Sequence, residues 1–190
     1  VIGGQRYAIW SGWAENAPTD QTQQNLYIAT MSSPTRISGR RVLLSQPDQP
    51  WEDNPGRFDL QEGPTILERD GRTFLVYSTR ESWLPDYRYG MLTLTNPAAP
   101  MEGASWAKST GPVFQRNGEV YGPGHGTFTQ SPDGSEWWMV YHAKTSTSGG
   151  WDDRVIRAQP FTWRADGTPD FGAPVASGTP IRRPSGECRP

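Results

Sequence analysis

Short apolar runs make up most of the chain, and turns that contain glycine separate them. Runs of this length, bounded in this way, are typical of β-strands. Three segments share one pattern: a turn glycine, polar residues, an aromatic residue, an aliphatic core and a second aromatic residue near the end. They occupy residues 4–11, 71–78 and 134–142. This internal repetition indicates a repeat architecture.

Further strand-like runs surround each copy of the repeat. We expect first strands at 1–2, 65–68 and 127–130, third strands at 26–30, 89–94 and 155–161, and fourth strands at 41–44, 112–114 and 173–175. Four short antiparallel strands per repeated unit are typical of propeller blades, although a β-sandwich also has many short strands. The recurring strand–glycine–strand hairpin favours blades, and no stretch has sustained helical periodicity.

The sequence therefore predicts an all-β fold, a β-propeller of which about three blades of four antiparallel strands are present. Propellers typically close with about four to eight blades, and the first copy lacks most of its first strand. We therefore expect residues 1–190 to be the C-terminal portion of a single, larger propeller domain.

Composition agrees with a turn-rich β-protein. The 190 residues include 18 Pro, 21 Gly and 9 Trp, and 34% of them are hydrophobic. The formal net charge of −2 gives no electrostatic reason to expect nucleic acid or an anionic membrane as a partner. No apolar run approaches the roughly 18 residues that span a bilayer. Cys188 is the only cysteine, which excludes a disulfide framework and a cysteine-based metal site in this chain.

Two motifs place chemically useful side chains at strand starts. Glu62 stands directly before Gly63-Pro64 and a strand, and His125 lies in the glycine-rich segment 121–126 before another strand. Both side chains are expected at one rim of the β-architecture. Glu62 has the alternative interpretation of an exposed glutamate at a strand end. His125 has three interpretations: a catalytic base, a core histidine, or part of a central ion site.

These motifs and two others together resemble glycoside hydrolase family 43, the five-bladed β-propellers that cut arabinose- and xylose-containing glycans. The other two are Asp153-Arg154 followed by residues 157–163, and the segment 166–172. Within the family, residues 7–13 and 26–29 are most similar to arabinofuranosidase-type members. The resemblance covers nearly the whole chain. It implies a secreted, extracellular hydrolase that acts on arabinan- or arabinoxylan-type carbohydrate, although no signal peptide is visible in this chain.

The resemblance also implies an inverting mechanism with three acidic residues. Glu62 matches the general acid, whereas the general base and the aspartate that tunes the acid's pKa match no residue of this chain. Inverting hydrolysis needs an acid and a base roughly 6.5–9.5 Å apart, with water between them. The acid must stay protonated, which requires burial or a like-charged neighbour. Glu62, followed by Gly-Pro and then by Ile66 and Leu67, is expected to be buried.

Four further residues receive candidate roles. The resemblance implies that His125 lies at the propeller axis and helps to hold a calcium or other cation, largely through waters, because imidazole is a poor direct calcium ligand. No organic cofactor is implied. Arg154 matches a family arginine that reaches the sugar or the acidic residues; the alternative is a surface ion pair. Trp13 and Trp83, each just past a second strand, are candidates for stacking on sugar, and packing between blades is the alternative.

Two other functions account for parts of the pattern. A catalytically inert sugar-binding propeller would explain the tryptophans and the missing acids. A sialidase-like propeller would explain Ser131-Pro132-Asp133-Gly134 followed by Trp137, which resembles an Asp-box turn. That spacing is one residue short, it occurs once, and no triad of arginines accompanies it. We therefore set the sialidase interpretation aside.

Overall fold

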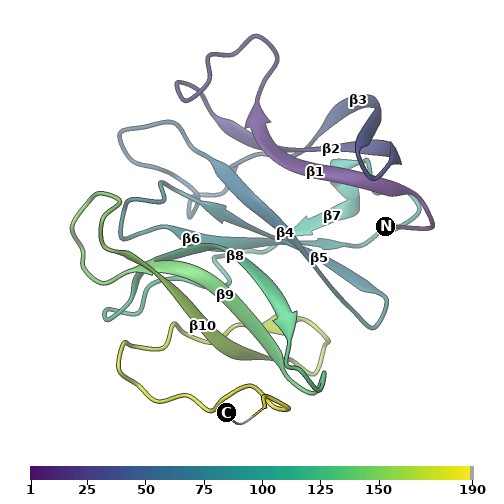
Figure 1. Cartoon of the computed structure of the whole chain (residues 1–190). Helices are drawn as coiled ribbons and strands as arrows, with labels where there is room; N and C mark the ends of the chain where they lie inside the picture. Colours follow the sequence, from purple (N-terminus) through teal and green to yellow (C-terminus); the bar gives the residue numbers. More distant parts are fainter. Residues whose placement is uncertain (189–190) are drawn as a thin grey trace. The chain divides into compact units, whose positions relative to one another are not determined.

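The structure, a computed structural model, describes residues 1–188 and is built from β-strands (Figure 1). Three sheets of consecutive antiparallel strands follow one another along the chain. The first contains β1 (Arg6–Trp13), β2 (Gln24–Ser33) and β3 (Arg36–Ser45). The second contains β4 (Gln61–Arg69), β5 (Arg72–Thr79), β6 (Arg88–Leu94) and β7 (Trp106–Lys108), and the third contains β8 (Tyr121–Gln130), β9 (Trp137–Lys144), β10 (Arg154–Trp163) and β11 (Pro169–Asp170). The 3-10 helix η1 (Gly103–Ser105) precedes β7.

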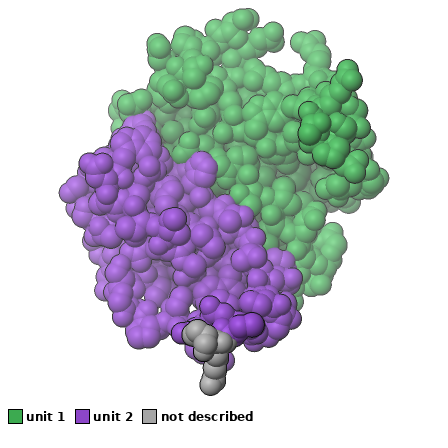
Figure 2. All heavy atoms as spheres, in the orientation of Figure 1, with its two compact units in different colours: residues 1–80, 90–111 green, residues 81–89, 112–190 purple. Residues whose placement is uncertain are grey.

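The chain divides into two compact units, which Figure 2 colours separately. Unit 1 comprises residues 1–80 and 90–111, and unit 2 comprises residues 81–89 and 112–190. Each unit has its own apolar core. In unit 1 the buried core consists of Leu26, Ile28, Leu44, Leu75, Tyr77, Leu92 and Trp106. In unit 2 aromatic rings dominate, with Phe128, Phe161 and Phe171 in mutual contact.

The three repeat glycines lie in hairpin turns with positive φ, as predicted. Gly4 and Gly71 are second residues of two-residue turns, because Ile2 pairs with Gln5 and Arg69 pairs with Arg72. Glycine is favoured where a tight hairpin requires φ > 0. Gly134 differs, since its turn spans the six residues between Gln130 and Trp137. The predicted strand–glycine–strand hairpins are therefore confirmed, with a longer third turn.

Two predicted fourth strands are wrong. Residues 112–114 form no strand; Phe114 makes only an isolated bridge to Tyr89, and the fourth strand of the second sheet is β7. Trp106 anchors β7 because its ring is buried and its Nε1 donates a 2.9 Å hydrogen bond to the Pro100 carbonyl. In the third sheet the fourth strand is β11 at residues 169–170, before the predicted 173–175. The strand predicted at 41–44 lies within β3, which is the third strand of its sheet because the first strand predicted at 1–2 is reduced to an isolated bridge between Ile2 and Gln5.

No helix among residues 1–188 has the length and apolar character that crossing a membrane requires.

Candidate functional site

Glu62 is the second residue of β4 and lies opposite Ser78 of β5. The strand pairing is interrupted between Glu62 and Thr65, where Gly63 adopts φ 56°. Only glycine adopts this left-handed conformation readily, and Pro64 then fixes the direction of the chain. Bulges of this kind redirect side chains and are common beside active sites. Glu62 is half-buried, so the expected burial is met in part.

The residue before Glu62 is held from inside unit 1 by a buried carboxylate. Glu52 is 0% exposed, and its Oε1 accepts hydrogen bonds from Gln61 Nε2 at 2.7 Å and the Tyr77 hydroxyl at 2.8 Å. Burial and the negative charge of Glu52 raise the pKa of Tyr77 well above its ordinary value, so the phenol remains a donor. Glu52 therefore anchors the start of β4.

The second carboxylate oxygen of Glu52 receives the contacts that balance the negative charge of this residue. Oε2 accepts hydrogen bonds from Lys108 Nζ at 2.9 Å and from the backbone N–H groups of Asp48 and Gln49 at 3.1 and 3.2 Å. Lys108 also pairs with the Asp48 carboxylate at 2.6 Å. A buried carboxylate is tolerated only when it is paired and hydrogen-bonded. Sequence analysis missed this network, since nothing near Glu52 in the sequence identifies its partners.

His125 lies in β8 with φ 49°, a strained conformation for a residue other than glycine. Its flanking glycines are required by packing within unit 2. A Cβ on Gly124 would overlap the ring of Tyr87, and one on Gly126 would overlap the Tyr89 hydroxyl and the Val140 carbonyl. The His125 side chain is exposed, which contradicts the core-histidine interpretation. Its Nδ1 lies 3.5 Å from the Tyr87 hydroxyl.

A second histidine, which sequence analysis did not single out, lies beside His125. The ring of His142 (β9) stacks on Tyr87 with centroids 5.4 Å apart and planes 5° from parallel, and its centroid is 6.4 Å from that of His125. Burial, and then the positive charges of Arg154, His125 and Lys144, lower the pKa of His142 from 6.5 to about 4. His142 is therefore a neutral imidazole near pH 7.

Arg154, the first residue of β10, lies in an aromatic cluster. Its guanidinium carbon is 4.3 Å from the ring centroid of Trp151, which in turn lies 5.0 Å from the ring of Trp83. The structure thus brings together Arg154 and Trp83, two of the candidate substrate-contacting residues, through their shared contact with Trp151. Arg154 makes no ion pair among residues 1–188, so the surface-ion-pair interpretation does not hold. Cation–π contacts with tryptophan are favourable, particularly for arginine.

A buried lysine holds the loop that carries Trp151. Lys144 is 0% exposed; its Nζ donates a 2.7 Å hydrogen bond to the Gly150 carbonyl and pairs with the Asp153 carboxylate. Asp153 also accepts hydrogen bonds from the Ser146 N–H and hydroxyl, and the hydrogen bond from Lys144 lowers the pKa of Asp153. Asp153 is therefore engaged in holding the loop.

Trp13 ends β1, opposite Gln24, and is half-buried. It belongs to unit 1 together with Glu62, whereas His125, Arg154 and Trp83 belong to unit 2. The predicted site residues are accordingly described as two sets, one in each unit.

The residues around His125 bear on the predicted cation. Residues 1–188 contain no group of three or more His, Cys, Asp or Glu side chains arranged to hold a metal ion. The groups beside His125 include the Tyr87 phenol and the His142 imidazole. Calcium prefers six to eight carboxylate, carbonyl and water oxygens. These side chains therefore do not fit a directly coordinated calcium ion.

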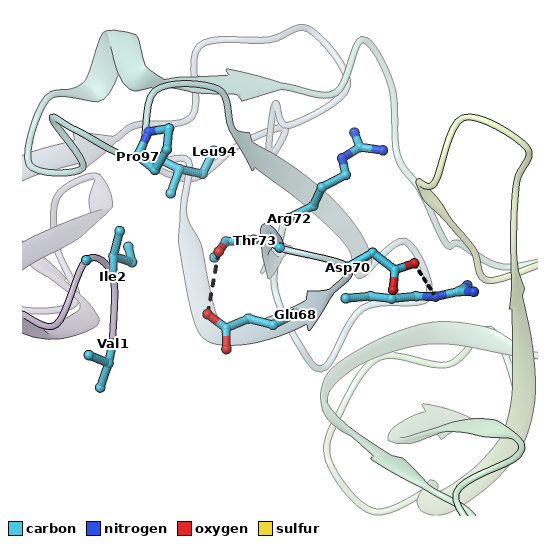
Figure 3. A pocket seen from close by; sticks show the side chains of 11 residues that line it. Val1, Ile2, Glu68, Asp70, Arg72, Thr73, Leu94 and Pro97 are labelled. Atoms are coloured by element: carbon cyan, nitrogen blue, oxygen red, sulfur yellow. Dashed lines mark hydrogen bonds and ion pairs between the residues drawn. The ribbon is translucent and has the colours of Figure 1, made fainter.

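Unit 1 contains a hollow of ≈ 530 Å³ (Figure 3). It is lined by Val1 and Ile2 and by the turn between β4 and β5, around Asp70. Glu62 is at the other end of β4. The hollow is therefore not part of the predicted acid site.

Comparison with known proteins gives consistent matches. The family model described as glycosyl hydrolases family 43 matches residues 2–169. An extracellular exo-alpha-(1->5)-L-arabinofuranosidase of Streptomyces avermitilis is 38% identical over 190 residues, and alpha-L-arabinofuranosidase 43 of Humicola insolens is 38% identical over 192 residues. Each match covers 96% of this chain and 38% of the relative, so the chain spans well under half the length of these relatives. The crystal structure of an alpha-L-arabinofuranosidase from Lactobacillus brevis superposes with a TM-score of 0.83 at 35% identity, covering 95% of this chain and 56% of that chain. The predicted propeller fold is confirmed.

Proposed function

This chain belongs to glycoside hydrolase family 43, and we propose that it is part of an α-L-arabinofuranosidase that cleaves arabinose-containing polysaccharides or oligosaccharides. The observation that carries the proposal is the similarity, at 38% identity over 96% of the chain, to two proteins named as arabinofuranosidases. Arabinan- or arabinoxylan-type glycans are the proposed substrates. One of these relatives is named extracellular, which supports secretion as the proposed location.

In the proposed mechanism, Glu62 is the general acid of an inverting hydrolysis. Its protonated carboxyl group donates a proton to the departing glycosidic oxygen while a base activates water on the opposite face of the sugar. The bulge at Gly63 and the anchored Gln61 support this role, because they restrict where the Glu62 side chain points. We propose that the general base and the pKa-tuning aspartate come from residues outside 1–190, because this chain spans only 38% of the relatives' length.

Arg154, Trp83 and Trp13 are the proposed substrate contacts. A guanidinium group can donate several hydrogen bonds to sugar hydroxyls, and indole rings stack on sugar faces. The contact of Arg154 with Trp151, and of Trp151 with Trp83, supports a preformed surface in unit 2. A cation beside His125 remains a proposal in which the imidazole bonds to the ion's waters. Calcium titration of chelator-treated protein, followed by the melting temperature, tests that part.

The decisive experiment replaces Glu62 with Gln in the enzyme that contains this chain. We expect turnover of unactivated arabino-oligosaccharides to fall by roughly 10²–10⁴-fold, the usual scale of general acid catalysis. Aryl arabinosides with a good leaving group need little protonation and should be largely spared. Circular dichroism should show an unchanged fold. Equal losses on both kinds of substrate would contradict the general-acid role.

A catalytically inert carbohydrate-binding propeller is the second candidate. The aromatic cluster of Trp83, Trp151 and Arg154 favours it, because this cluster suits binding and needs no catalytic acid. The same assay separates the two candidates: an inert propeller binds arabino-oligosaccharides and hydrolyses neither kind of substrate.

A further inference from the structure

His142 presents a binding feature that the proposed mechanism does not use. Both of its ring nitrogens are shielded from solvent and have no hydrogen-bond partner. A neutral imidazole carries one N–H donor and one acceptor nitrogen. Leaving such groups buried and unpaired is unfavourable, so each one requires an explanation. The most direct explanation is a binding partner, either a ligand or an ordered water.

The position of the ring is determined by packing that leaves its nitrogens out of the contact. Tyr87, which is 0% exposed, covers one face of the His142 ring in a parallel stack. Gly124 pairs with His142 across the β8–β9 ladder, and the absence of a side chain there makes room for the Tyr87 ring. A stacked ring is held by its face, whereas its nitrogens lie at its edge. The stack on Tyr87 therefore leaves both buried nitrogens without a partner.

A second unpartnered donor lies on the same face of the sheet. Arg154 lies opposite Lys144, two residues beyond the pair of Ile156 and His142, so Arg154 and His142 are neighbours on adjacent strands. The Arg154 guanidinium acts electrostatically on His142. Its Nε is also buried without a partner. The pair thus offers two or more donors and one acceptor.

This combination of groups selects among ligands. An anion would be served by donors alone and would leave the acceptor nitrogen of a neutral imidazole unused. A hydroxyl group both donates and accepts, so two neighbouring hydroxyls match the imidazole and the guanidinium together. Sugars are the ligands that present such hydroxyls in pairs.

We propose that His142 is a sugar-binding residue that uses its ring edge, beside Arg154, to bind neighbouring hydroxyls of an arabinose unit. The assignment rests on the proposed function, since it takes the arabinose-containing glycan as the ligand. It adds a residue on β9 to the proposed substrate contacts.

The test is the substitution His142→Phe, because phenylalanine keeps the stack on Tyr87 and removes both nitrogens. We expect the folded protein to be at least as stable as the wild type, since two buried unpaired polar atoms are lost. Binding of arabinotriose, measured by calorimetry in the Glu62→Gln enzyme to prevent turnover, should weaken by roughly 10–100-fold. His142→Gln, which retains a donor and an acceptor, should recover part of the affinity.

Ile156→Ala is the matched control. Ile156 lies directly opposite His142 in the β9–β10 ladder and is 85% exposed, so Ile156→Ala should leave stability unchanged and controls for the loss of a side chain on this face of the sheet. If His142→Phe binds arabinotriose as tightly as the parent, the nitrogens serve only water or packing and the inference is overturned, while the proposed function stands. If His142→Phe destabilises the fold and His142→Gln recovers no affinity, the residue is structural. If the parent protein binds no arabino-oligosaccharide and the wild type hydrolyses none, the proposed function fails and the inference fails with it.

Discussion

Removing the buried Glu52 carboxylate should destabilise unit 1 more than any change to its surface charges. Glu52→Ala would leave Gln61 Nε2, the Tyr77 hydroxyl and two backbone N–H groups without their acceptor. It would also leave Lys108, whose side chain is 14% exposed, with Asp48 as its remaining carboxylate partner.

The magnitude follows from these contacts. Removing one partner of a buried ion pair costs about 3–5 kcal/mol. The surviving contact between Lys108 and Asp48 places our expectation for Glu52→Ala near the lower end, at about 3 kcal/mol. Glu52→Gln keeps the volume and some of the hydrogen bonds but loses the charge-assisted bond to Lys108, and losing such a bond costs about 1.5–3 kcal/mol. We therefore expect the free energy of unfolding to be highest for the wild type, lower for Glu52→Gln and lowest for Glu52→Ala.

Urea unfolding of the three proteins measures the free energy of unfolding, and hydrogen exchange of peptides from β4 and β5 shows whether the loss lies in unit 1. Asp70→Asn is the control: the ion pair of Arg69 and Asp70 is 3.1 Å long but exposed on both sides, and such pairs contribute about 0–1 kcal/mol. A Glu52→Ala protein that is as stable as Asp70→Asn would refute the reasoning that this carboxylate anchors β4.

Two further predictions concern unit 2. Gly124→Ala should lower the free energy of unfolding by about 1–3 kcal/mol, because the new methyl group overlaps the ring of Tyr87. The control is Gly111→Ala, whose added Cβ meets nothing within 4 Å. Equal melting temperatures for the two variants would contradict the prediction. Acidification from pH 6.5 to about 4 should destabilise the wild type, because the unfolded chain protonates the His142 imidazole near pH 6.5 and the folded protein only near pH 4. This difference in pKa corresponds to a loss of stability of roughly 3 kcal/mol, which partial exposure of the side chain reduces to about 1–2 kcal/mol. His142→Phe should lack this loss. Parallel pH–stability curves for the wild type and His142→Phe would therefore rule out His142 as the cause.

Local sequence signals were sufficient for the hairpins and for the backbone at the candidate site, but not for the fourth strands of the second and third sheets. The Asp70-Gly71 turn, with φ of 50° and 74°, lies where the strand–glycine–strand pattern predicts it. Gly63 likewise marks a backbone conformation that other residues adopt only with strain. The glycines on either side of His125 mark positions where a side chain would overlap neighbouring residues. These features are readable because a turn or a bulge depends on the conformational preferences of a few adjacent residues.

Side-chain partners were decided by the tertiary structure. Glu52 meets Tyr77 across 25 positions of sequence and Lys108 across 56, and no local pattern identifies either contact. His142 reads in the sequence as the end of an apolar strand, and only its stack on Tyr87 and its unpartnered nitrogens make it a candidate for binding. β7 is the fourth strand instead of the predicted 112–114, because residues 106–108 form a ladder with β6 whereas Phe114, although buried, makes only an isolated bridge. Backbone conformation depends on nearby residues, whereas charge pairing, burial and hydrogen-bond satisfaction depend on which distant segments the fold brings together.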